Sequence, residues 1–153
     1  MSPGRAVFLL CVGAGYVVAV SAAVIVTVGL ILTPEILRHM AGGAALSLLR
    51  DLPAMLALGF VWTFSCALPG FVVAIVLGER RSWDRWHRYA LAGLANAAPS
   101  LAIFGLVFGS PFDAPPMVVA SFPGGFAGGA AYWFSTGRLL ARRRPTAPMP
   151  SGS

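Results

Sequence analysis

Few side chains in this sequence are of the types that bind metals or react as nucleophiles, and they are widely spaced. Glu35 and His39 are four residues apart, so on a helix they would share one face, but two ligands without a third make a weak metal site. We expect a surface ion pair between Glu35 and Arg38 instead. Cys11 and Cys66 belong to no C-x-x-C pair and have no histidine at ligand spacing, which predicts two buried free thiols rather than a metal cluster or a disulfide.

Haem binding and the common catalytic motifs are not indicated either. A haem within a bilayer needs histidines that project from facing helices, whereas His39 and His87 fall in two separate polar segments. The chain contains no P-loop, no nucleophile elbow and no H-E-x-x-H sequence. We therefore predict that the protein is not an enzyme and that it needs no cofactor and no metal.

The composition indicates a membrane protein. Of the 153 residues, 58% are hydrophobic and only 10% are charged, which is far from the balance of a soluble domain. The net charge is +6, but eleven cations among so many apolar residues cannot cover a groove-binding face. The expected partner is therefore the lipid bilayer and not a nucleic acid.

Four apolar stretches are long enough to cross the hydrocarbon layer, which takes about 20 residues as a helix. None of the four contains Asp, Glu, Lys or Arg, and none alternates as the strands of an outer-membrane barrel do. The sequence thus predicts an all-α integral membrane bundle of four transmembrane helices within residues 1–141. The spans are residues 6–33, 52–78, 89–109 and 116–137.

The positions of the arginines predict how the chain is threaded, because positively charged short loops are retained in the cytoplasm. Nine arginines lie on the side that holds both termini and the second loop, and only Arg38 and Arg50 lie on the other side. This favours both termini in the cytoplasm, while the composition favours the bacterial inner (cytoplasmic) membrane. A cleaved signal peptide is the alternative for the first span, but apolar residues continue through Leu32, which favours an uncleaved helix.

The first loop, residues 34–51, has the pattern of a short amphipathic helix. Thr33, Pro34 and Glu35 resemble an N-cap, a first-turn proline and a first-turn acid. The apolar residues that follow share one helical side; they are Ile36, Leu37, Met40, Ala44 and Leu48. We therefore expect a possible interfacial helix in this loop, lying in the outer membrane surface.

The second loop and the tail are predicted to lie on the cytoplasmic side. Trp83 and Trp86 stand among four arginines and are expected to act as interfacial anchors at the level of the lipid headgroups. Residues 142–153 are rich in arginine, proline and serine and should form a disordered tail. The alternative is that this extended segment docks a partner.

Small residues recur at spacings of three and four in the first, second and fourth spans, which predicts close helix packing. The glycines expected in these contacts are Gly59, Gly70, Gly124, Gly125, Gly128 and Gly129. We favour packing within the four-helix bundle. The alternative is that the fourth helix faces a membrane-protein partner or a second copy of the chain.

Three prolines and one asparagine lie near the middle of the predicted spans. Pro69, Pro99 and Pro123 are expected to kink the second, third and fourth helices. Asn96 is the most polar residue near a membrane centre, and Ser100 lies one turn away on the same face. We predict a hydrogen bond between helices at Asn96; a substrate contact is the alternative.

The segment from Pro123 to Arg138, PGGFAGGAAYWFSTGR, resembles the closing segment of small uncharacterised multi-span membrane proteins of proteobacteria. The resemblance covers this segment alone and implies no activity. Tyr132, Trp133 and Arg138 are predicted to form an aromatic and cationic anchor at the cytoplasmic face. Small multidrug transporters also have four spans, but this chain lacks the membrane-embedded glutamate of those proteins.

These patterns leave three functional hypotheses. The favoured one is a structural or accessory membrane component that packs through its small-residue faces. The alternative is a small transporter or channel-like protein with kinked helices around Asn96, although no Asp, Glu, Lys, Arg or His lies within the spans to carry ions or protons. A lipid-modifying enzyme using Glu35 and His39 is disfavoured by the missing motifs.

The predicted topology can be tested with fusions after Ser153. A reporter that is active only in the cytoplasm should be active there, because four spans return the chain to its starting side. A bright periplasm-active reporter at the same position would contradict the topology.

Overall fold

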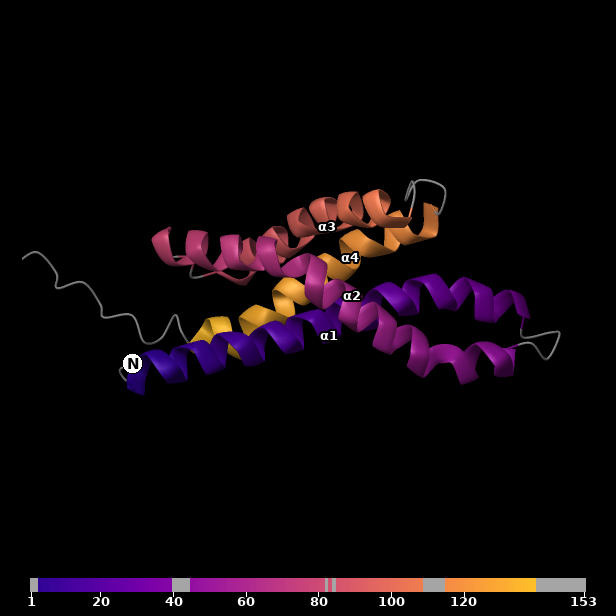
Figure 1. Cartoon of the computed structure of the whole chain (residues 1–153), viewed down its shortest axis with the longest axis horizontal. Helices are drawn as coiled ribbons and strands as arrows, with labels where there is room; N and C mark the ends of the chain where they lie inside the picture. The colour runs from indigo at the N-terminus through magenta and orange to yellow at the C-terminus, as the bar shows by residue number, and fades with distance from the viewer. Residues whose placement is uncertain (1–2, 40–44, 82, 84, 109–114, 140–153) are drawn as a thin grey trace, which may run out of the picture.

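The computed structural model describes residues 3–39, 45–81, 83, 85–108 and 115–139, and it is helical over almost all of them (Figure 1). Helix α1 spans Pro3–His39 and helix α2 spans Ala45–Arg80. Helix α3 spans Trp86–Phe108 and helix α4 spans Pro115–Tyr132. A π-helical segment, η3, covers Trp133–Gly137 and continues α4 without a break as far as Leu139. The predicted tail, residues 142–153, lies outside the described residues.

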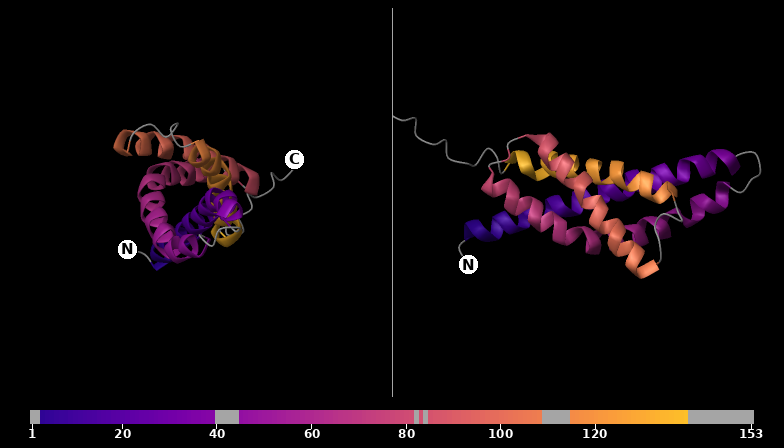
Figure 2. Two further views of the ribbon diagram at one scale, coloured as in Figure 1. Left: turned by 90° about the vertical axis from the view of Figure 1, so that its right-hand side faces the viewer. Right: turned by 90° about the horizontal axis from the view of Figure 1, so that it is seen from above.

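The helices run up and down, α1 and α3 in one direction and α2 and α4 in the other (Figures 1 and 2). The start of α1, the end of α2, the start of α3 and the end of η3 therefore lie at one end of the bundle. At the opposite end, α1 and α2 extend beyond α3 and α4 as a helical hairpin (Figure 1). The extension follows from length, since 37 residues make a helix of about 55 Å.

Three of the helices are long and apolar enough to cross a membrane: Ala6–Pro34, Arg50–Gly78 and Trp86–Val107. These ranges agree with the first three predicted spans to within a few residues. The fourth helix is shorter and less apolar, because its sequence is rich in glycine and proline. Large aliphatic side chains face outward along the bundle, as with Leu58, Leu106 and Val119, which are 73%, 87% and 70% exposed.

The predicted interfacial helix in the first loop is wrong for the residues that the structure describes. Pro34 lies inside α1, and the Thr33 hydroxyl donates to the Gly29 carbonyl at 2.6 Å instead of capping a new helix. Pro34 removes one backbone donor, whereas ending α1 there would leave several carbonyls without partners. Ile36 and Leu37 accordingly extend α1, and Leu48 belongs to α2. Met40 and Ala44 lie outside the described residues.

Helix α4 packs closely on both α1 and α3 through its paired glycines. A Cβ atom on Gly128 would lie 2.8 Å from the Ala19 carbonyl oxygen, and one on Gly124 would lie 2.9 Å from the Ala23 oxygen, both in α1. The other glycine pair faces α3, where a Cβ atom on Gly125 would lie 2.5 Å from the carbonyl oxygen of Gly93.

Gly129 lies against the backbone of Tyr89 and Ala90 in α3. All four glycines of α4 therefore contact other helices of the same chain. This is the packing within the bundle that the spacing favoured. A partner would have to contact some other face of α4.

Helix α2 joins the bundle through side chains rather than through close backbone contact. Tyr16, Val20 and Val24 of α1 form a buried cluster, and residues of α2 pack against it; these are Leu56, Phe60, Phe64 and Phe71. Gly59 makes a milder approach, since a Cβ atom there would lie 3.3 Å from a Val24 methyl. The result is a tight unit of α1, α4 and α3, with α2 held beside it by large side chains.

The three mid-span prolines lie inside helices, Pro69 in α2, Pro99 in α3 and Pro123 in α4. Pro53 is a further proline within α2. Helix α2 changes direction along its length in both side views (Figures 1 and 2), as expected where a proline removes a backbone donor. The bend matters because the site described below lies against α2 at Gly70.

Replacing Gly129 with alanine should lower the stability of the bundle. The added methyl would meet the backbone of α3, with a Cβ atom 2.8 Å from the Tyr89 carbonyl carbon, and overpacking of this kind costs about 1–3 kcal/mol. Gly29→Ala is the matched control, because nothing lies within 4 Å of a Cβ atom at that position of α1. Unfolding by titrated SDS in mixed micelles measures both. Equal stability of the two variants would contradict the packing described.

Candidate functional site at Asn96

Asn96 lies midway along α3 and bonds to α2. Its Nδ2 donates to the Ala67 carbonyl oxygen at 3.1 Å, which makes the contact between helices that the sequence predicted for this side chain. A carbonyl can only accept, so the amide nitrogen must face Ala67 and the amide oxygen must point elsewhere. That oxygen, Oδ1, is buried and accepts no hydrogen bond from any described residue.

The local sequence of α2 makes room for this carboxamide. A Cβ atom on Gly70 would overlap the Asn96 amide, lying 2.5 Å from its Cγ, so the side chain occupies space that any residue except glycine would fill. Pro69 stands just before Gly70 and interrupts the hydrogen bonding of α2. Gly70 therefore supplies the space for Asn96, next to a proline that weakens the backbone hydrogen bonding of α2.

Two cavities meet at Asn96, between α2 and the unit formed by α1, α4 and α3. The first, which we call the tyrosine cavity, has a volume of about 80 Å³, and its lining includes Tyr16, Tyr89 and Tyr132. The second, the hydroxyl cavity, has a volume of about 220 Å³, and its lining includes Thr27, Ser100 and Ser121. Five residues line both cavities: Ala23, Thr63, Gly93, Asn96 and Gly125.

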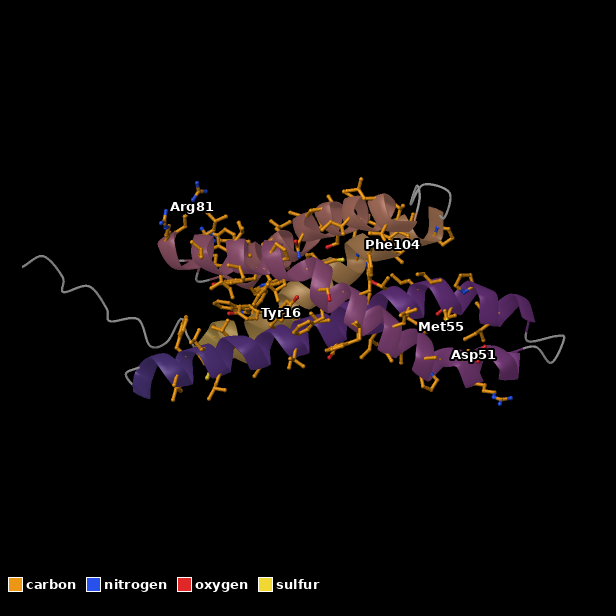
Figure 3. All side chains as sticks on the ribbon, viewed as in Figure 1. Tyr16, Asp51, Met55, Arg81 and Phe104 are labelled. Atoms are coloured by element: carbon orange, nitrogen blue, oxygen red, sulfur yellow. The ribbon has the colours of Figure 1, made fainter. Side chains whose placement is uncertain are left out.

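The two cavities lie end to end along the bundle. Tyr16 belongs to the tyrosine cavity and Phe104 to the hydroxyl cavity, and Figure 3 shows these residues at different levels along the long axis. Arg81 marks the end beyond the first cavity, and Asp51 marks the opposite end (Figure 3). Asn96 thus stands where one cavity gives way to the other.

The described residues that line the two cavities include no Asp, Glu, Lys, Arg or His. The polar groups are hydroxyls, the Asn96 amide, the Trp62 indole N–H and the Cys66 thiol, set among aliphatic and aromatic walls. Ser100 donates to the Asn96 backbone oxygen at 2.9 Å, so its proton is used within α3. Such a lining can bind uncharged groups but offers no partner to a full charge.

An aromatic cluster narrows the tyrosine cavity. The Tyr16 hydroxyl donates to the Phe64 carbonyl oxygen, and the Tyr16 ring lies 4.3 Å from that of Phe71. The cluster continues from Phe71 to Tyr132 at 5.1 Å and from Tyr132 to Tyr89 at 5.7 Å, centroid to centroid. These rings therefore close this end of the tyrosine cavity, whose volume is about 80 Å³ against about 220 Å³ for the hydroxyl cavity.

Tyr132 and Trp133, which the sequence assigned to the lipid interface, are instead buried within the bundle. They are 3% and 8% exposed, and Trp133 stacks on Tyr89 at 5.3 Å. Gly15 and Gly137 provide the space, since a Cβ atom on Gly15 would lie 2.9 Å from the Tyr132 ring and one on Gly137 would lie 2.5 Å from that of Trp133. Burial of these rings is a correction to the anchor prediction.

The other predicted anchors, Trp83, Trp86 and Arg138, differ in how exposed they are. Trp83 is half-buried, with its ring 5.5 Å from that of Tyr89. Trp86 is 44% exposed and lies 6.1 Å from the ring of Phe126. Arg138 is exposed at the end of η3. Trp86 and Arg138 thus keep the exposure that an anchor needs.

Of the two cysteines, Cys66 lines a cavity together with Asn96 and Cys11 does not. Cys66 is buried and lines the hydroxyl cavity, Cys11 is partly buried, and both are free thiols. Within the described residues, no three His, Cys, Asp or Glu side chains come together as a metal site would need. The side chains of Glu35 and His39 lie outside the described part of the structure.

The helices and the outward-facing aliphatic side chains define an integral membrane protein. No family model, no curated protein and no solved structure matches this chain. Its function must therefore be inferred from the geometry at Asn96.

Gly70→Ala and Asn96→Ala should be strongly non-additive in stability. The Gly70 methyl would displace the Asn96 amide and break its bond to Ala67, a loss of about 0.6–2 kcal/mol for a bond between membrane helices. In an Asn96→Ala background the methyl meets no amide, so the same change should cost little. A double-mutant cycle in mixed micelles measures the coupling. Additive effects would show that the amide does not occupy this space.

Proposed function

We propose that this protein is a small four-span transporter or channel-like protein of the bacterial inner membrane, which takes uncharged molecules at Asn96. It follows from this proposal that the protein carries out no chemical step and binds no cofactor. The observation that carries the proposal is the buried, unpartnered Oδ1 of Asn96 at the junction of two cavities.

The length of α4 supports a fourth span. The chain is helical from Pro115 to Leu139, and such a helix is about 37 Å long against roughly 30 Å of hydrocarbon. Its low hydropathy does not argue against a membrane position, because Gly124 and Gly128 face α1 while Gly125 and Gly129 face α3. These residues meet protein rather than lipid, so they need not be apolar for the helix to be stable in a bilayer.

The positions of the charges support the proposed orientation. Arg80, Arg81, Arg85 and Arg88 all belong to the end of α2, the start of α3 and the connection between them, and Arg138 follows η3 at the same end of the bundle. Arg50 lies near the start of α2, at the other end. Under the positive-inside rule this distribution supports a cytoplasmic position for the first end and for both termini.

The state of Asn96 argues for a bound molecule. A buried acceptor without a donor destabilises a protein by about 1–3 kcal/mol, and lipid cannot supply the donor. A purely structural bundle would gain stability from an apolar side chain at this position. In this structure the oxygen is closed off against Gly70 of α2. Retaining the amide makes sense if movement of α2 lets water or a ligand from the cavities reach it.

The lining supports an uncharged molecule rather than an ion. Moving a charge into the bundle centre is unfavourable without a partner charge or a ring of oxygens, and the cavity walls carry no acidic or basic side chain. The position of the cavities also suggests how access could change. They lie against α2, which is held by large side chains and bends near Pro69, so movement of α2 would open or close them.

An accessory role is the second candidate, and it is favoured by the outer face of α2. Side chains along this face are well exposed; Leu58, Val61, Val72 and Val73 are 73%, 63%, 50% and 57% exposed. Lipid covers such a face equally well. A second membrane protein bound there would make this chain a subunit of a larger assembly.

Cysteine accessibility distinguishes the two candidates. In a chain with Cys11 and Cys66 replaced by alanine, Asn96→Cys and Ser100→Cys should react with N-ethylmaleimide, a small uncharged reagent, because both positions line a cavity. Ala98→Cys is the matched control, since Ala98 is exposed on the outer face of α3 at similar depth and a thiol in lipid does not form the reactive thiolate. Labelling at Ala98 alone, or at none of the three with a partner that co-purifies in mild detergent, would overturn the transport proposal.

A further inference from the structure

The end of the bundle where α2 meets α3 carries most of the positive charge. Arg80, Arg81 and Arg85 are exposed there, with Arg81 marking this end in Figure 3. In the sequence as a whole, nine of the eleven arginines but only two of the five acidic residues belong to the segments predicted at this end. The opposite segments hold two arginines and three acidic residues, so the two ends differ in the sign of their net charge.

Backbone and ring contacts fix the connection from which these arginines project. The Arg81 N–H donates to the Leu77 carbonyl oxygen at 2.9 Å, and the Trp83 N–H donates to the Gly78 carbonyl oxygen at 2.9 Å. The Trp83 ring packs edge to face on Tyr89, with the ring centroids 5.5 Å apart. The backbone at Arg81 is therefore held in one place, and a ligand does not have to order it.

An exposed aromatic pair lies directly beside these arginines. Trp86 follows Arg85 at the start of α3 and is 44% exposed, and Phe126 of α4 is 37% exposed. The two rings meet edge to face with their centroids 6.1 Å apart. Tyr132 and Trp133, by contrast, are buried in the bundle and cannot reach a lipid.

The positions of Trp86 and Phe126 place them at different depths. Trp86 begins the apolar span of α3, and Phe126 lies in the middle part of α4. An indole with its single N–H suits the glycerol-ester level of a bilayer, whereas a phenyl ring suits the hydrocarbon below it. Arginine, indole and phenyl groups thus follow one another in the order of a phospholipid's phosphate, ester and acyl chain.

We propose that the outer surface formed by Arg81, Arg85, Trp86 and Phe126 is a binding site for one anionic phospholipid of the adjoining leaflet. The guanidinium groups bind the phosphate through charge-assisted hydrogen bonds, and the rings flank the ester and the chain. The net positive charge selects an anionic headgroup over a zwitterionic one. A free phosphate or an acidic soluble protein would use the arginines alone, and the exposed rings beside them favour a ligand that also carries hydrocarbon.

This site goes beyond the proposed function and does not depend on it, since a transporter and an accessory subunit could each bind such a lipid. It also gives separate roles to the two tryptophans that the sequence predicted as anchors. Trp83 packs on Tyr89 and stabilises the connection, whereas Trp86 is the exposed ring that meets the lipid.

Native mass spectrometry of the full chain tests the site. Protein in a mild detergent is mixed with equimolar dioleoylphosphatidylglycerol and dioleoylphosphatidylcholine, which carry the same chains, and the first bound lipid is identified by its mass. We expect the anionic lipid to bind about tenfold more tightly than the zwitterionic one. Inorganic phosphate, compared with chloride at equal ionic strength, should not displace it.

Matched variants locate the contact. Replacing both arginines, Arg81→Gln with Arg85→Gln, should make the two lipids bind equally, whereas Arg50→Gln, exposed at the opposite end, should keep the preference. Trp86→Ala should weaken the binding of both lipids by about threefold and keep the preference. Leu58→Ala, at an exposed position of α2, should change neither.

Every variant is first checked for a single monodisperse peak in detergent, and if the double arginine variant fails this check, Arg85→Gln alone takes its place. Equal binding of the two lipids to the unmodified chain, or displacement by inorganic phosphate, would overturn the proposal. So would a preference that survives the loss of both arginines, or lipid binding that Trp86→Ala leaves unchanged. None of these results bears on cysteine labelling at position 96, so this proposal and the proposed function are tested separately.

Discussion

Polar groups inside a hydrocarbon solvent must find their hydrogen-bond partners within the protein, and the structure depends on how this constraint is met. Serine and threonine hydroxyls donate to carbonyls one turn earlier, as Ser65 does to Val61, or across to another helix, as Thr136 does to Cys11. The same constraint explains why α1 runs on through Pro34, since one missing donor is less costly than a helix end. Against this background the free oxygen of Asn96 is an exception, and exceptions of this kind mark functional positions.

The arrangement of the helices also depends on how closely their backbones approach one another. Glycine pairs on opposite sides of α4 bring the backbones of α1 and α3 into contact with it, and the three helices form a firm unit. Helix α2 contacts this unit through Phe64, Phe71 and other large side chains, which hold it further away. The cavities lie in the space so created. One sequence feature, the spacing of glycines, therefore determines both the closely packed part of the bundle and the space in which the cavities lie.

The sequence was sufficient to predict the helices, because an apolar run of this length without a charged residue is the pattern of a membrane-spanning helix. It also indicated contacts at the glycines of α4 and at Asn96, since in lipid small and polar residues are what hold helices together. The burial of Tyr132 and Trp133 was not predictable from their type. It depends on Gly15, which is far away in sequence, and on the π-helical turn that places the Trp133 ring against Tyr89. The residue pattern of a single helix does not reveal which distant residues will pack against it.

The cavities could not be predicted from the sequence either, because they result from the spacing between helices rather than from any one residue. The sequence predicted a polar contact at Asn96. Only the structure shows that the amide nitrogen is hydrogen-bonded and that the amide oxygen has no partner among the described residues. The continuation of α1 through Pro34 was mispredicted because Thr33-Pro34-Glu35 resembles a helix start in water. In an apolar setting the need to keep backbone carbonyls bonded outweighs that local preference.

The central claim is that the Asn96 carboxamide meets water or a ligand from the cavities, and it can be tested directly because Asn96 is the single asparagine in the chain. Labelling with ¹³C,¹⁵N-asparagine gives one side-chain carboxamide signal in solid-state NMR of the protein in lipid bilayers. Water-edited spectra report whether polarisation passes from mobile water to that carboxamide. We expect rapid transfer, which a small uncharged ligand should reduce by displacing the water. A carboxamide that receives no polarisation from water, with its oxygen bonded to a group of the protein, would contradict the claim.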